Sequence, residues 1–142
     1  MDALVAVLVG WIALHTGLSV GPPPHIEFVT PAMMTERALG PGIAPSPLLR
    51  ALYSQRTRTV YLRREWDVTN LRDQSELVHE LAHHFQNIHE LKFGCAAERE
   101  KLAYDLQFAW LREQGVADPH ELLEINQFFV VMISVCRDVA HD

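Results

Sequence analysis

Positive charge is scarce in this sequence. Its 142 residues include 12 Lys and Arg against 18 Asp and Glu, for a formal net charge of -6. The cations form no long run, so the sequence lacks the basic surface that nucleic-acid binding requires, and we expect no nucleic-acid partner. The chain also shows no internal repeat and no domain boundary. Residues 1–142 are therefore expected to form a single domain with one core.

Cysteine is scarcer still, with Cys95 and Cys136 as the only two. Neither has a second sulfur at the C-x-x-C spacing of a zinc knuckle, which excludes that class of metal site. A disulfide between the two is geometrically conceivable. Two buried free thiols in a reducing compartment fit the sequence equally well, so both alternatives stay open.

The first apolar run lacks the charge of a targeting signal. Residues 3–20 are mostly apolar, but Asp2 precedes them and no Lys or Arg occurs before Arg37, so the positive n-region of a signal peptide is missing. Polar residues and Gly17 interrupt the run, which favours a helix that ends at a glycine cap. We expect no membrane span. The compartment (cytoplasmic, or periplasmic or secreted) and the oligomeric state are not determined by the sequence.

The strongest chemical signal is an H-E-x-x-H motif formed by His79, Glu80 and His83, in a stretch expected to be helical from about Gln74 to Asn87. Histidines four residues apart lie one helical turn apart, so both imidazoles can hold one zinc ion. The glutamate points about 100° away and can act as general base on a zinc-activated water. The apolar residues of this stretch cluster opposite the histidines, which therefore face a cleft.

Strand-like and helix-like segments surround the motif and predict an α+β fold. Asn70 or Asp73 is expected to cap the motif helix. Residues 48–53 are ambiguous. The expected elements are a helix within residues 3–20, a strand at His25–Val29, a short helix at Ala32–Leu39, a strand at Arg58–Leu62, a helix at Ala96–Gln114 ended by Gly115, and a last helix from His120 to about Val139.

A catalytic zinc site needs three protein ligands and one exchangeable position. His89, Glu98 and Glu100 compete for the third ligand. His89 has the spacing of the longer motif H-E-x-x-H-x-x-G-x-x-H, but Gln86 occupies the glycine position. Glu98 falls among the solvated charges of its helix, whereas Glu100 falls in the apolar sector, where a carboxylate must be paired or bind a metal. We favour Glu100 as the third ligand, with His89 and Glu98 as alternative ligands. If Glu100 binds no metal, the alternative is a buried ion pair between Glu100 and an arginine.

Two further side chains of the same helix, Tyr104 and Gln107, are expected to lean toward the cleft. Either of them can hold a zinc ligand in place or stabilise a developing oxyanion. A tyrosine packed in the core is the alternative for Tyr104.

The motif residues resemble a known arrangement. His79-Glu80-Leu81-Ala82-His83 followed by Glu100-Lys101-Leu102-Ala103-Tyr104 is similar to the gluzincins, in which the third zinc ligand is a glutamate on a following helix. Tyr104 stands where the gluzincin signature has an aspartate. The pattern thus resembles a small gluzincin, or minigluzincin. The run Leu77–Gln86, with Tyr104-Asp105-Leu106-Gln107 and Trp110-Leu111, resembles an uncharacterised bacterial family of small zincin-like domains over about residues 11–115.

This resemblance implies a compact zincin-like fold, with a small sheet packed against the motif helix and further helices, one N-terminal and two C-terminal, around it. It also implies a zinc metallopeptidase that hydrolyses a peptide or protein substrate of unknown sequence. In zincins the peptide lies along an edge strand above the metal, and residues 59–62 are the candidate strand here. Two alternatives remain: a zinc-stabilised binding or regulatory module without catalysis, and a structural helical domain in which the histidines are incidental.

Overall fold

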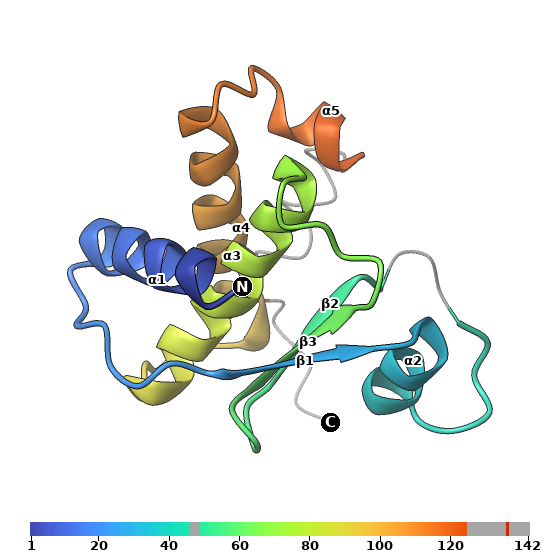
Figure 1. Cartoon of the computed structure of the whole chain (residues 1–142). Coiled ribbons are helices and arrows are strands. Elements are labelled where there is room, and N and C mark those ends of the chain that lie inside the picture. Colours follow the sequence, from blue (N-terminus) through green and yellow to red (C-terminus); the bar gives the residue numbers. More distant parts are fainter. Residues whose placement is uncertain (46–48, 125–135, 137–142) are drawn as a thin grey trace.

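The computed structural model describes residues 1–45, 49–124 and 136. Within them the fold is α+β, with five helices and a three-stranded sheet (Figure 1). The mixed class expected from the sequence is confirmed. The elements are α1 (Asp2–Thr16), β1 (His25–Val29), α2 (Pro31–Leu39), β2 (Ala51–Ser54), β3 (Thr59–Arg63), α3 (Leu71–Ile88), α4 (Ala96–Glu113) and α5 (Pro119–Leu123).

The sheet has the strand order β1-β3-β2, with β1 parallel and β2 antiparallel to β3. Side chains of β3 alternate between its two faces, as the pleat of a strand requires. Val60 and Leu62 are fully buried in the main core, whereas the intervening Tyr61 lies under Arg37 of α2, whose guanidinium carbon is 5.0 Å from the ring centre. The core helices and α2 therefore cover opposite faces of the sheet.

The strand order corrects one expectation. Residues 59–62 were expected to be the edge strand that receives a substrate, but β3 is paired on both sides. The free edge near the motif helix belongs instead to β2, the segment that the sequence left ambiguous. The reason is that β1, from much earlier in the chain, pairs in parallel with β3 and occupies its second edge.

Helix α3 is the central element and carries the motif (Figure 1). Its first turn is capped by Asn70, whose side chain accepts a hydrogen bond from the Asp73 N–H at 3.0 Å. Asn70 is one of the two residues expected to cap this helix. Its apolar side is buried against α1 and the sheet, and each such side chain contributes about 1.5–3 kcal/mol. The fully buried members are Leu77, Val78, Leu81, Ala82 and Phe85. The opposite side of α3 packs along α4.

Helix α1 begins at Asp2 and ends at Thr16, where Gly17 takes a left-handed φ of 75°. A residue with a Cβ is disfavoured in this conformation, so the glycine explains why the helix ends here. Its buried residues, such as Leu8 and Ile12, pack in the main core. No helix in the described part of the chain is long and apolar enough to cross a membrane.

The two cysteines form a disulfide, which decides between the two alternatives left by the sequence. Cys95 and Cys136 have Cα atoms 5.8 Å apart and are separated by 41 residues. Cys95 is the N-cap of α4, so the bridge ties residue 136 to the beginning of this helix.

The expected long helix from His120 to about Val139 is wrong at its first turns. Helix α5 ends at Leu123, and Glu124 adopts a left-handed φ of 56°. A left-handed residue breaks the i to i−4 hydrogen-bond ladder, so no continuous helix can pass this position. Residues 125–135 and 137–139 of the expected helix lie outside the described residues.

Candidate metal centre

The two motif histidines lie on one side of α3, with ring centres 5.0 Å apart. A carboxylate from α4 faces both of them. The Glu100 Oε2 atom is 3.0 Å from His79 Nε2, and Glu100 Oε1 is 3.1 Å from His83 Nε2. The structure therefore brings together the three residues that the sequence favoured as zinc ligands. Because α3 and α4 pack along each other, one helical turn of each supplies the whole donor set.

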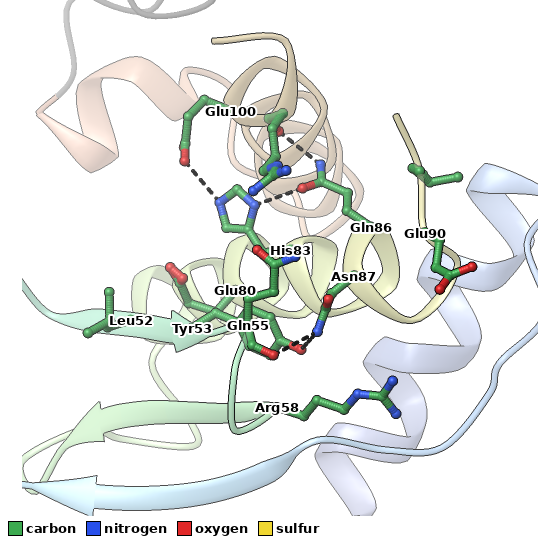
Figure 2. Close-up of a pocket in the computed structure, with 12 residues that line it drawn as sticks. Leu52, Tyr53, Gln55, Arg58, Glu80, His83, Gln86, Asn87, Glu90 and Glu100 are labelled. Atoms are coloured by element: carbon green, nitrogen blue, oxygen red, sulfur yellow. Dashed lines mark hydrogen bonds and ion pairs between the residues drawn. The ribbon is translucent and has the colours of Figure 1, made fainter. Parts of the chain in front are cut away.

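The tautomer of His83 is determined by Gln86. The Gln86 side-chain nitrogen donates to the backbone carbonyl of Arg99 at 2.9 Å, and a carbonyl can only accept. The amide oxygen of Gln86 must therefore face His83 Nδ1, which lies 2.9 Å away. An oxygen acceptor at this distance requires a proton on Nδ1. Figure 2 shows the two ring nitrogens of His83 pointing in opposite directions, one to Gln86 and the other to Glu100.

A second hydrogen-bonded chain determines the tautomer of His79 in the same way. The Ser75 hydroxyl donates to the Arg72 carbonyl at 2.7 Å, so its oxygen is left to accept from the side-chain nitrogen of Gln107 at 3.2 Å. The Gln107 amide oxygen then faces His79 Nδ1 at 2.9 Å, which must carry the proton. Gln107 thus holds a candidate ligand in place, one of the two roles expected for it. Both of its polar atoms are engaged in the described structure.

Both imidazoles consequently present Nε2 to the carboxylate of Glu100. With neutral imidazoles, two nitrogen lone pairs face a negatively charged carboxylate, and this arrangement is unfavourable unless positive charge is added between them. Either protons on Nε2 or a metal ion meets this demand. Burial alone would raise the pKa of Glu100, but the hydrogen bonds and charges of His79 and His83 hold it well below its usual range. Burial alone would lower the pKa of His83, but Glu100 and Glu80 raise it.

Glu80 lies beside this group without joining it. One ligand atom each from His79, Glu80 and His83 falls within 4.8 Å of the others, which is compatible with metal binding. Glu80 is buried, and its Oε2 atom has no hydrogen-bond partner in the described structure. Burial raises the pKa of Glu80, against the lowering effect of the two histidines. The carboxylate of Glu100 faces both Nε2 atoms, so Glu100 is the candidate third ligand and Glu80 is the neighbouring carboxylate.

The two alternative ligands lie elsewhere. The His89 ring donates through Nε2 to the Ser19 carbonyl at 2.8 Å. His89 follows α3 directly, and the helix runs through Gln86 without the early break that the longer motif needs. Glu98 is exposed and accepts a hydrogen bond from the Gly94 N–H at 2.7 Å, just before the beginning of α4. Neither residue contacts the donor set.

Tyr104 packs its ring against His79, with ring centres 4.5 Å apart. Burial and the negative charges of Glu100 and Glu80 raise the pKa of Tyr104 to about 12, so the phenol stays protonated at neutral pH. Its hydroxyl makes no hydrogen bond in the described part of the chain. The proposed part in oxyanion stabilisation remains a prediction.

A cleft of about 470 Å³ opens beside the donor set (Figure 2). Leu52 and Tyr53 both line it, although they project to opposite faces of β2, so the cleft follows the free edge of this strand. Its other lining residues are Gln55, Arg58, Glu80, His83, Gln86, Asn87, Glu90, Leu91, Arg99 and Glu100. The expected cleft on the histidine side of the helix is therefore present.

Gln86 is a site residue whose role was not predicted from the sequence, where it stands in the glycine position of the longer motif and at the end of the run Leu77–Gln86. Its position three residues after His83 places it on the same side of the helix, and this spacing was an available signal. Its second contact, with the Arg99 carbonyl, depends on the packing of α4 and has no signal in the sequence.

His84, the neighbour of His83, is buried on another side of α3. Its Nε2 donates to the Pro22 carbonyl at 2.8 Å, and its Nδ1 is 2.8 Å from the Tyr53 hydroxyl. The same hydroxyl accepts from the Asn87 side-chain nitrogen at 3.0 Å. These contacts connect α3 to β2 and to the segment before β1.

The fold and the donor set define an α+β protein with a candidate metal centre between two helices. The chain belongs to the family described as a domain of unknown function, DUF6647, whose model matches residues 1–142. No curated protein and no solved structure matches the chain.

Proposed function

We propose that this protein is a zinc-dependent metallopeptidase of the gluzincin type. The observation that carries the proposal is the pair of determined tautomers. Gln86 and Gln107 place the protons of His83 and His79 on Nδ1. Two Nε2 lone pairs then face the two oxygens of the Glu100 carboxylate, and nitrogen and carboxylate donors in this number suit zinc.

His79, His83 and Glu100 would hold the metal, and bound zinc would lower the pKa of a water toward about 7 and polarise a peptide carbonyl. Glu80 takes the proton of the attacking water and delivers it to the leaving amine. Its unpartnered Oε2 and its position at the cleft support this role. Its burial supports it too, because a raised carboxylate pKa makes a better base near neutral pH.

The substrate is an extended peptide. β2 is an edge strand whose outer side borders the cleft, so its backbone N–H and C=O groups are available to pair with an added strand. Pairing with β2 would place a peptide beside Glu80 and the donor set, which line the same cleft.

The test compares purified wild type with Glu80→Gln, using metal mass spectrometry and cleavage of a pooled peptide library. Glu80→Gln keeps the side-chain size but removes the base, so we expect near-stoichiometric zinc in both proteins and a rate about 10²- to 10⁴-fold lower in the variant. Glu36→Gln, an exposed change on α2, is the matched control and should retain full activity.

Activity that survives Glu80→Gln would refute the mechanism. Stoichiometric zinc without cleavage by wild type would instead favour the zinc-stabilised module that does not catalyse. Absence of zinc after reconstitution would leave the histidines as structural residues.

A further inference from the structure

Arg99 occupies an unusual position for an arginine of this protein. It precedes Glu100 on α4 and lines the cleft. Its Nε atom is buried and has no hydrogen-bond partner, and its guanidinium has no ion pair with any residue in the described ranges. By contrast, Arg37, Arg50, Arg63 and Arg72 all form ion pairs.

The position of this guanidinium is maintained by neighbours that carry no charge. The Arg99 Cζ atom lies 5.8 Å from the centre of the Phe93 ring, so the cation is placed over an aromatic face. The Arg99 backbone is held by the hydrogen bond from Gln86, the residue that orients His83. The cation is thus positioned relative to the donor set, and its buried Nε atom has no hydrogen-bond partner among the described residues.

The missing partner is an anion that enters the cleft. A guanidinium presents a planar fork of donors that matches a carboxylate. A phosphate carries up to twice the charge of a carboxylate, so the carboxylates of Glu80, Glu90 and Glu100 in the same cleft would repel it more strongly than they repel a carboxylate. Arg58, on the turn between β2 and β3, also lines the cleft and adds a second positive charge without an ion pair among the described residues.

We propose that Arg99 is a specificity residue that selects peptides carrying a carboxylate, which its guanidinium binds while the peptide lies along β2. The carboxylate comes either from the free C-terminus of the peptide or from an Asp or Glu side chain. The peptide nature of the ligand rests on the function proposed above.

The test measures peptide binding by fluorescence anisotropy, using full-length Glu80→Gln loaded with zinc so that no peptide is consumed. The probes are two pairs of fluorescent hexapeptide pools, randomised over apolar residues. One pair differs by a free C-terminus or a C-terminal amide. The other pair is amidated and differs by a Glu or a Gln in the middle. We expect one carboxylate pool to bind about 10- to 100-fold more tightly than its neutral partner.

Arg99→Gln in the same background should abolish this difference, and Arg99→Lys should retain part of it because the charge remains without the fork. Arg112→Gln, an exposed change near the end of the same helix, should retain all of it. Zinc content and thermal unfolding of each variant show that the fold and the metal site are intact. The pool that shows the preference identifies the source of the carboxylate.

Equal binding of charged and neutral pools, binding of none, or a preference that survives Arg99→Gln would overturn the proposal. Cleavage of the same pools by the wild-type protein tests the proposed peptidase function separately from the role of Arg99. Carboxylate-selective binding without cleavage would refute hydrolysis and support the role of Arg99, whereas cleavage without selectivity would refute the role of Arg99 alone.

Discussion

His83 and His84 are neighbours in the chain, yet the structure uses them in opposite ways. His83 directs Nε2 at the carboxylate of Glu100, and its pKa is raised against the effect of burial. His84 directs Nε2 at the neutral carbonyl of Pro22, and burial lowers its pKa. Successive helical residues project about 100° apart, so the two rings meet different surroundings. The partner of each ring nitrogen, rather than the residue type, makes His83 a candidate ligand and His84 a structural residue.

The largest expected effect separates these two histidines by metal content. His83→Ala removes one of three proposed ligands and should leave the purified protein almost free of zinc, while His84→Ala should keep near-stoichiometric zinc. Metal mass spectrometry on both variants, with circular dichroism to verify folding, makes the comparison. Equal zinc content in two folded variants would show that the difference between the two rings has no bearing on metal binding.

A smaller effect on zinc binding is expected from a change at Gln86, which contacts His83 but not His84 and is not itself a proposed zinc ligand. Gln86→Leu leaves His83 Nδ1 without its oxygen acceptor, so we expect zinc affinity to fall about 10- to 100-fold. Competition with a chromogenic chelator measures this affinity. Asn87→Ala, one residue further along α3, removes a side chain that contacts Tyr53 and should leave the affinity unchanged. A similar loss in both variants would point to general loosening of the helix.

The smallest effect concerns the stability supplied by His84. His84→Leu leaves the Pro22 carbonyl without its hydrogen-bond donor and the Tyr53 hydroxyl without an acceptor for its proton, although Asn87 still donates to that hydroxyl. We therefore expect a loss of about 1–3 kcal/mol in the free energy of unfolding at pH 7.5. Urea denaturation measures this loss.

The stability difference between wild type and His84→Leu should depend on pH. Burial, with Arg58 and His89 nearby, lowers the pKa of His84 in the folded protein below its ordinary value of about 6.5. On acidification the unfolded chain therefore binds this proton first, and wild type loses stability as the pH falls below about 6.5. The difference between wild type and His84→Leu should be smaller at pH 5.5 than at pH 7.5. A difference that stays constant would show that folding does not shift the pKa of His84, and one that grows would show that folding raises this pKa; either result would contradict the prediction.

Local signals in the sequence located most of the fold. The strand His25–Val29 is found as expected, Asn70 caps the motif helix, and Gly17 ends the first helix. Each of these depends on side chains within a few residues of the feature. The helical wheel likewise separated Glu100 from Glu98 correctly as the residue that faces the histidines, because this separation depends only on helical periodicity.

Contacts between segments that are distant in the sequence could not be predicted from such local signals. The central position of β3 follows from its parallel pairing with β1, and no residue of β3 specifies that partner. The second contact of Gln86 and the unpaired state of Arg99 depend on where α4 lies against α3. The end of α5 depends on Glu124, a residue type that gives no local signal for a left-handed turn.

The disulfide between Cys95 and Cys136 closes a covalent ring that contains Glu100 but neither His79 nor His83. A single backbone cut anywhere between residues 95 and 136 would open this ring without releasing a fragment. Such a nicked molecule would migrate as one band on a non-reducing gel and as two bands after reduction. The proposed third ligand would then remain covalently attached to the rest of the chain through sulfur, even if the peptide backbone on one side of it were broken.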